Sequence, residues 1–309
     1  MYTGVDVIIP TYKPGESLLD ILEKLRKQTV EINRIIIINT EKDYFDEKIY
    51  VTAPNVEVHH ITRAEFDHAA TRDYAIKMSQ AEYVLLMTMD AVPCDEHLVE
   101  KLLSSFENNN VAVAYARQLP KKDCRMQEKY TRLYNYPEKS IVKTKKDIDT
   151  LGIKAFFCSD VCAMYKRSIY DKLGGFVEKA IFNEDTFYAA KALENGYAVM
   201  YQAEAMVYHS HNYSCMEQLK RNFDLGVSQA EHPEIFENIR SEKEGISLVK
   251  NTAAYLARNG KWYEIPYLIV SSAYKYAGYR LGKKYKKLSH KRIMKLTLNK
   301  YYWNNETKN

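Results

Sequence analysis

Residues 83–90 read YVLLMTMD, an apolar run that leads directly into a single acid, Asp90. A run without polar interruption predicts a strand that is covered on both faces, as in a parallel sheet. Such sheets bind ligands beyond the carboxyl ends of their strands, so we expect Asp90 to lie at a ligand-binding edge. A lone acid at a strand end is also a common turn or helix-cap residue.

Short apolar runs and helix-like segments alternate on both sides of this strand. This alternation predicts an α/β fold with a mixed, mostly parallel sheet and helices on both faces. The carboxyl ends of the first strands direct attention to residues 10–12, 39–43 and 89–91. The expected strands cover residues 5–9, 34–39, 55–61, 83–89 and 111–117, and the expected helices cover 16–28, 69–79 and 95–107.

The second half of the chain changes character twice. Residues 119–153 are polar and lysine-rich, and we expect loops and short helices over an active-site edge. The next expected features are a strand within 155–165, a turn at Gly174-Gly175, a helix opening near Glu184 and a strand pair around 198–208. From Ser214 onward the pattern is helical, so the sequence predicts a sheet domain over 1–215 and a helical extension over 216–309.

The composition of the 309 residues is that of an ordinary globular protein, with 46% hydrophobic and 28% charged residues. Its five cysteines are odd in number and scattered, which argues against a disulfide framework and a zinc knuckle. The sequence predicts no membrane-spanning helix and no signal peptide, so we expect a cytoplasmic protein.

The net charge of +5 is unevenly distributed. Residues 271–309 contain eleven Lys or Arg and one acid, Glu306, so the rest of the chain is acidic overall. This tail predicts contact with an anionic partner, although a solvated basic helix has the same composition. The tail has no zinc-finger or RNP signature, and the acidic remainder would repel phosphates, so we expect no nucleic-acid partner and favour a membrane surface.

An apolar seam with spacings of three and four runs along the same region. It predicts a helix that packs against the body of the protein or a second copy of the chain, with a position in lipid as the alternative, while the flanking lysines contact an anionic surface. A homodimer is therefore one expectation. The seam consists of Tyr263, Tyr267, Val270, Tyr274, Ala277, Leu281, Tyr285 and Leu288.

Several common catalytic motifs are absent from the sequence. It contains no GxGxxG, no P-loop and no GxSxG. Asp147-Ile148-Asp149 matches a bare DxD pattern, but it follows a lysine-rich stretch instead of a buried strand. We interpret it as coincidental.

Five short stretches carry a more specific signal through their order. They are VIIPTY at 7–12, FDHAATRD at 66–73, TMDA at 88–91, LGGF at 173–176 and NED at 183–185. Together they resemble family 2 glycosyltransferases of GT-A fold, particularly bacterial rhamnosyltransferases, over residues 4–215. By this resemblance, residues 1–118 bind a nucleotide sugar and residues 119–215 carry the acceptor and catalytic part.

The resemblance implies a role for each matching residue. Asp185 is the general base, supported by Glu184, and the N-terminus of their helix keeps an acid ionised; acids at such a position are also ordinary capping residues. Ser159 and Asp160 fall in the acceptor region, and Mg²⁺ or Mn²⁺ is held by Asp90 with His209 or His211. The implied nucleotide-sugar-binding residues are Pro10, Thr11, Tyr12, Asn39, Thr40, Arg72 and Asp90.

Two departures from the family pattern affect these implications. Thr88 replaces the first acid of the DxD motif, and Asn39-Thr40-Glu41 stands where many members have DDGS. The resemblance implies an inverting enzyme that transfers L-rhamnose from dTDP-rhamnose to a polysaccharide precursor linked to polyprenyl diphosphate, at the inner face of the cell membrane. The alternatives are a family 2 enzyme that uses a UDP-sugar and a catalytically inactive assembly partner.

Overall fold

The computed structural model describes residues 4–51, 53–236 and 242–304. Residues 1–3 of the expected sheet domain and 305–309 of the expected basic tail lie outside the described residues. The described chain divides into two compact units. The first comprises Met1–Leu119, Tyr136–Lys179 and Glu184–His209, and the second comprises Pro120–Asn135, Ala180–Asn183 and Ser210–Asn309. Pro120–Asn135 and Ala180–Asn183 therefore belong to the same unit as the C-terminal helices, whereas the sequence predicted a single domain boundary at residue 215.

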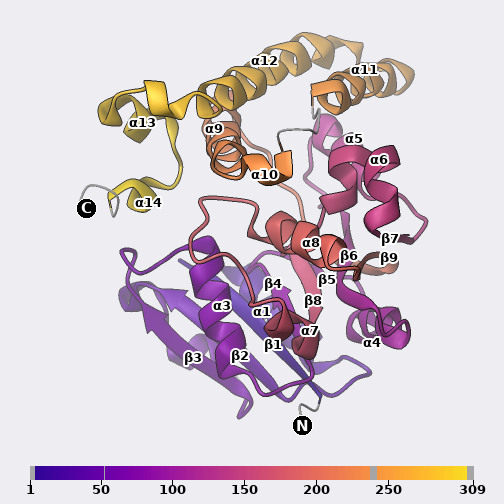
Figure 1. Cartoon of the computed structure of the whole chain (residues 1–309), viewed down its shortest axis with the longest axis vertical. Helices are drawn as coiled ribbons and strands as arrows, with labels where there is room; N and C mark the ends of the chain where they lie inside the picture. The colour runs from indigo at the N-terminus through magenta and orange to yellow at the C-terminus, as the bar shows by residue number, and fades with distance from the viewer. Residues whose placement is uncertain (1–3, 52, 237–241, 305–309) are drawn as a thin grey trace. The chain divides into compact units, whose positions relative to one another are not determined.

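The first unit is built on a mixed sheet with the strand order β3-β2-β1-β4-β8-β6-β9-β5 (Figure 1). Strands β1 to β4 run parallel, while β8 pairs antiparallel with β4 and β6. The strands are β1 (Val5–Tyr12), β2 (Arg34–Thr40), β3 (Val56–Ile61), β4 (Tyr83–Met87), β5 (Val92–Pro93), β6 (Val111–Leu119), β7 (Ile141–Lys143), β8 (Cys162–Lys166) and β9 (Ala198–Tyr208).

Helices cover both faces of this sheet, as the sequence predicted. Ile37 on β2 packs in a core cluster with Leu22 and Leu102, which come from α1 and α4. Ile8 and Ile36 are fully buried outside that cluster, on the face where α3 packs against β1 and β2. The helices of this unit are α1 (Glu16–Arg26), α2 (Glu47–Tyr50), α3 (His68–Met78), α4 (Leu98–Ser104), α6 (Ile148–Leu151), α7 (Arg167–Lys172) and α8 (Glu184–Glu194).

The structure corrects three local expectations. The expected strand pair around 198–208 is one continuous strand, β9, whose register against β6 shifts between Ala116 and Arg117. The residues between Gln202 and Met206 are therefore left out of the pairing with β6. The strand expected within 155–165 begins only at Cys162, after a 3₁₀ helix over Gly152–Phe156. The segment expected as loops and short helices also contains the strand β7 and the ten-residue helix α5 (Met126–Asn135).

The second unit is helical and has its own small core, in which Phe223, Val227, Ile293 and Trp303 are buried together. None of the described helices is both long enough and apolar enough to span a bilayer. In addition to α5, the unit contains α9 (Cys215–Glu231), α10 (Pro233–Phe236), α11 (Glu242–Arg258), α12 (Ile265–Gly282), α13 (His290–Leu296) and α14 (Lys300–Asn304).

Glycines decide which face of α12 is buried. Gly278 and Gly282 touch the backbone of α9 so closely that an added Cβ would collide with the carbonyl oxygens of Leu219 and Phe223. The packed face of α12 is therefore its small-residue face, because small residues let two helix backbones approach. The first half of the predicted seam, Tyr263, Tyr267, Val270 and Tyr274, is exposed in the described chain, and its packing against a second copy stays a prediction.

Candidate active site

The carboxyl ends of β1 and β2 are joined by a buried polar contact. Thr11 Oγ1 donates a hydrogen bond to Asn39 Oδ1 at 3.1 Å, and the Asn39 amide donates to the carbonyl of Glu41 at 3.0 Å. Thr11, Asn39 and Thr40 are all buried. Their side chains therefore hold the two strand ends together, and the surface beyond them is formed by their neighbours.

Aromatic and cationic side chains lie just beyond this edge. The rings of Tyr12 and Tyr44 meet edge to face with centroids 5.7 Å apart. The Lys13 ammonium lies 4.2 Å from the centroid of the Tyr44 ring, and the Arg63 guanidinium lies 4.8 Å from that of Tyr12. An aromatic face flanked by cations suits a stacked base and a phosphate.

Helix α3 begins in the FDHAATRD stretch, and its sequence explains its position. Asp67 is the N-cap, because its Oδ1 accepts hydrogen bonds from the amides of Ala69 and Ala70 at 2.9 and 3.0 Å. One turn later, Arg72 folds back and donates to the His68 carbonyl at 2.9 Å. The capped start of α3 thus holds the Arg72 guanidinium at the N-terminal end of the helix.

The LGGF stretch is tied to the same helix. Gly174 and Gly175 both have a positive φ, and a Cβ at Gly175 would press on Asp73 of α3. Asp73 accepts a hydrogen bond from the Tyr170 hydroxyl at 2.8 Å, and that hydroxyl accepts one from the Phe176 amide at 3.1 Å. This turn leads the chain toward the start of α8.

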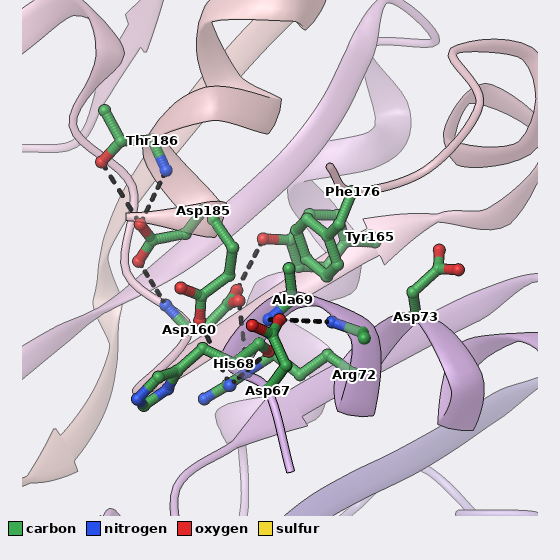
Figure 2. A network of polar contacts seen from close by, with 12 residues as sticks. Asp67, His68, Ala69, Arg72, Asp73, Asp160, Tyr165, Phe176, Asp185 and Thr186 are labelled. Atoms are coloured by element: carbon green, nitrogen blue, oxygen red, sulfur yellow. Dashed lines mark hydrogen bonds and ion pairs between the residues drawn. The ribbon is translucent and has the colours of Figure 1, made fainter. Parts of the chain in front are cut away.

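Three buried ionisable groups from different segments meet next to these elements (Figure 2). The Arg72 guanidinium lies 3.2 Å from Glu184 on α8 and 3.4 Å from Asp160, which follows the 3₁₀ helix. All three side chains are less than a tenth exposed. The resemblance implied that Arg72 binds the nucleotide sugar. In the structure its guanidinium forms ion pairs with these two acids.

Asp185 lies beside this group and has two amide donors. Its carboxylate accepts hydrogen bonds from the Thr186 amide at 2.6 Å and from the Asp160 amide at 3.1 Å (Figure 2). Burial, followed by the neighbouring Glu184 carboxylate, raises the pKa of Asp185 to about 7, while the two amides and Arg72 partly offset the rise. A carboxylate with this pKa can accept a proton near neutral pH.

Asp160 is more deeply buried than Asp185. Its Oδ1 accepts a hydrogen bond of 2.6 Å from the Tyr165 hydroxyl, and only 3% of the residue is exposed. Burial raises the pKa of Asp160 well above its ordinary value, against the opposing effect of Arg72. Tyr165 was not singled out from the sequence, because it sits within the apolar strand β8 and looks like an ordinary core residue.

A second polar group surrounds Asp90, beyond the end of β4. The Asp90 carboxylate lies 3.5 Å from Nε2 of His209, which follows the last residue of β9. An oxygen and an imidazole nitrogen at this separation suit a divalent cation. Thr88, at the position of the missing acid, has a buried hydroxyl with no hydrogen-bond partner among the described residues. His211 lies two residues beyond His209, and its ring stacks on Tyr213.

Gln118 connects this group to the acceptor region and was missed by the sequence analysis. Its Oε1 lies 2.9 Å from Nδ1 of His209, and its amide nitrogen donates to Ser159 Oγ at 2.9 Å. Because an amide oxygen can only accept, Nδ1 of His209 carries a proton, and Nε2 is the ring nitrogen that faces Asp90. The available signal was a polar residue, 2% exposed, at the end of the apolar strand β6.

The two polar groups are neighbours along the chain, because Ser159 belongs to one and Asp160 to the other. Backbone strain also marks this region: the described non-glycine residues with positive φ are Lys13, Glu41 and Asn183. Each is adjacent in sequence to a residue predicted for the site.

Asp147 of the coincidental DxD pattern has a local role. Its carboxylate accepts a hydrogen bond from the Thr144 hydroxyl at the start of a 3₁₀ helix.

The family profile for Glycosyl transferase family 2 matches residues 6–174, which is more than half of the chain. The protein therefore belongs to this family and is a glycosyltransferase. The motif-based resemblance is confirmed, and so is the α/β fold of GT-A type.

Two curated relatives align over nearly the whole chain. The O-antigen chain rhamnosyltransferase RfbN of Salmonella typhimurium is 36% identical over 305 residues, which are 97% of this chain and 96% of the relative. The O-antigen chain rhamnosyltransferase WbaN of Salmonella anatum is 35% identical over 302 residues, which are 97% of this chain and 95% of the relative.

Two solved structures share the fold at low sequence identity. The mannosyltransferase PcManGT from Pyrobaculum calidifontis, in complex with GDP-Man and Mn²⁺, superposes with a TM-score of 0.56 at 15% identity, covering 100% of this chain and 87% of that one. S. aureus TarS 1–349 in complex with UDP-GlcNAc has a TM-score of 0.51 at 14% identity, covering 92% of each chain.

Proposed function

We propose that the protein transfers L-rhamnose from dTDP-rhamnose to a hydroxyl group of a polysaccharide precursor, with inversion at the anomeric carbon. The observation that carries the proposal is the Asp185 carboxylate, which is held by two amides, lies beside Glu184 and has a pKa of about 7. Two relatives that are O-antigen chain rhamnosyltransferases support rhamnose as the sugar. The intact group of Asp160, Glu184 and Arg72 argues against an inactive assembly partner.

The proposed chemistry is a single displacement. The acceptor oxygen forms a bond to the anomeric carbon as the bond from that carbon to the diphosphate oxygen breaks. The hydroxyl proton passes to the Asp185 carboxylate, and dTDP leaves with the bonding electron pair. Arg72 balances the charge of Glu184 and Asp160 and thereby keeps Asp185 ionised for part of the time at neutral pH. Ser159 and Asp160 are proposed to position the acceptor.

The donor side of the proposed site follows the sheet edge. Tyr12 is proposed to contact the nucleobase, next to Pro10, while the buried Thr11, Asn39 and Thr40 shape the ends of β1 and β2 beneath it. Arg72 is proposed to act on the donor through the charge balance of the acid group and not by direct phosphate contact.

The group around Asp90 is proposed to hold a divalent cation, Mg²⁺ or Mn²⁺. Asp90 and His209 of the first unit would bind it, and the family resemblance adds His211 as a further ligand. When bound, such an ion supplies positive charge to the diphosphate of the leaving group. Gln118 keeps His209 in the tautomer that can coordinate a metal.

The acceptor and the location of the enzyme are proposed from the C-terminal region. A precursor linked to polyprenyl diphosphate would place the reaction at the inner face of the cell membrane. The lysines of the second unit support this placement, because basic residues near an anionic surface contribute on the order of 1 kcal/mol each. A homodimer is compatible with the same region and is tested below.

Donor choice can be tested by a thermal-shift panel with dTDP-rhamnose, UDP-sugars and GDP-sugars, each with and without Mn²⁺. We expect the largest stabilisation from dTDP-rhamnose, since a bound ligand stabilises the folded state in proportion to RT ln(1 + [L]/Kd). A larger shift with a UDP-sugar, together with transfer of that sugar, would replace the proposed donor.

The metal part of the proposal has its own matched pair of variants. Asp90→Asn should abolish the Mn²⁺-dependent part of the thermal shift. Asp149→Asn, which alters the coincidental DxD, should leave it unchanged. Full transfer activity of the parent protein in excess chelator would show that the leaving group is stabilised without a metal.

A further inference from the structure

Helix α12 and the turn before it expose a row of large apolar side chains in the second unit. Each is more than a third exposed, although isolated apolar residues are the rule on protein surfaces. We call this row the α12 surface. It consists of Trp262 (69% exposed), Tyr263 (56%), Tyr267 (38%), Ile269 (59%), Val270 (48%), Tyr274 (37%) and Tyr276 (56%).

These side chains form one surface because of helix geometry. At 3.6 residues per turn, the members of the row on α12 occupy one side of the helix. The other side, with Leu268, Ser271, Gly278 and Gly282, is buried. The glycines fix how α12 packs on α9, and on the exposed side the Tyr267 hydroxyl accepts a hydrogen bond from Arg125 at 2.8 Å.

The charges around the α12 surface have one sign. Residues 265–305 contain no Asp or Glu and ten Lys or Arg. Directly after α12, the chain carries a basic run over residues 283–295. Its exposed members are Lys283, Lys284, Lys286, Lys287, Lys291, Arg292 and Lys295.

This combination selects one class of partner. Trp and Tyr have an apolar body and a polar edge, and they concentrate at the boundary between lipid and water. A helix with an apolar side and nearby cations lies in the plane of an anionic bilayer surface. Nucleic acid would use the cations but leave the α12 surface without a partner, and the absence of acids matches an anionic surface.

We propose that the α12 surface inserts into the headgroup region of an anionic bilayer, while the basic run contacts the lipid phosphates. This inference rests on the membrane contact in the proposed function and names the residues that make it. The α12 surface supplies the apolar signal and the basic run supplies the electrostatic one, and stable peripheral binding needs two such signals.

Vesicle flotation of the full chain tests the proposal, with vesicles of phosphatidylcholine alone or mixed with phosphatidylglycerol and without nucleotide sugar. Ile269 and Ile246 provide a matched pair, because both are 59% exposed and both lie on helices of the second unit. Ile269→Asp should lower the partition coefficient on mixed vesicles by roughly tenfold. Ile246→Asp adds the same charge and should change it by less than about twofold.

Tryptophan fluorescence gives a second measurement. The chain has two tryptophans: Trp262 is 69% exposed, while Trp303 is 3% exposed. We expect a blue shift on adding mixed vesicles that Trp262→Phe abolishes. A blue shift of unchanged size in Trp262→Phe would come from Trp303 alone and would mean that Trp262 stays in water, which would overturn the proposal.

The remaining outcomes separate this inference from the proposed function. Equal effects of Ile269→Asp and Ile246→Asp would overturn it. If replacing the lysines of the basic run by Gln abolished binding while Ile269→Asp had no effect, membrane contact would stand and the α12 assignment would fail. A dimer that Ile269→Asp dissociates, with no vesicle binding by the parent, would make the surface an interface between two copies. Flotation uses no donor, so none of these results bears on sugar transfer.

Discussion

The pKa of Asp185 leads to a pH dependence whose direction can be worked out from the structure. The base must be ionised to accept a proton, so kcat/KM should fall as the pH drops below about 7. With that pKa, roughly one-tenth of the molecules carry the ionised base at pH 6 and about nine-tenths at pH 8. We therefore expect a loss of about tenfold in kcat/KM between pH 8 and pH 6.

The causes of the shift predict how a variant should behave. After burial, the Glu184 carboxylate is the largest cause that raises the pKa of Asp185. Glu184→Gln removes this like charge and releases Arg72 from one of its acidic partners. Both effects stabilise ionised Asp185, so the acidic limb should move to lower pH by about one unit. Glu194→Gln alters an exposed acid at the far end of α8 and should leave the limb in place.

The assay is the initial rate of sugar transfer from pH 5 to 9 at low donor concentration, for the parent and both variants. The absence of an acidic limb between pH 5 and pH 9 in the parent would mean that the pKa of the titrating base is not raised as Asp185 requires. A limb near 7 that stays unmoved in Glu184→Gln would assign the titration to another group, such as the donor itself. Movement to higher pH in that variant would refute the electrostatic reasoning.

Three further changes have expected outcomes. Asp185→Asn should lower turnover by roughly 10²- to 10⁴-fold in single-turnover assays while the donor-induced thermal shift is retained, and near-normal turnover would remove Asp185 from the mechanism. Gln118→Met should weaken Mn²⁺ binding by about 10- to 100-fold in calorimetry, whereas Gln118→Glu, which can still accept from His209 Nδ1, should restore most of it. Gly282→Val should destabilise the fold by about 1–3 kcal/mol in urea unfolding, because its side chain meets the α9 backbone. Gly245→Ala, with no atom near the added methyl group, should be neutral or stabilising, and equal losses would disprove the role of close packing.

Much of the fold follows from local rules that act within a few residues. The continuous apolar run of β2 predicts a strand covered on both faces, and its isoleucines are indeed buried. The turn predicted at Gly174 and Gly175 is equally local, and both glycines have a positive φ. These features could be predicted because hydrophobic periodicity and turn residues depend on neighbours along the chain.

The contacts of the candidate site depend on distance in space instead. Arg72 and Glu184 are 112 positions apart in the sequence, and Gln118 and His209 are 91 positions apart. No periodicity indicates that such side chains meet, because crossover connections and sheet order bring them together. For the same reason, the sequence did not show that Arg72 would form ion pairs with two acids.

Helix α12 is a case in which the local sequence pattern and the tertiary contacts favour different buried faces. Its sequence is apolar on nearly every side, so its spacing fits more than one buried face, and the first half of the predicted seam is exposed in the described chain. Close backbone packing at Gly278 and Gly282 selected the small-residue side, since only residues without bulky side chains allow two helices to approach so closely. The larger aromatic side chains were thereby left on the exposed side, and only the tertiary packing of α12 against α9 decided this.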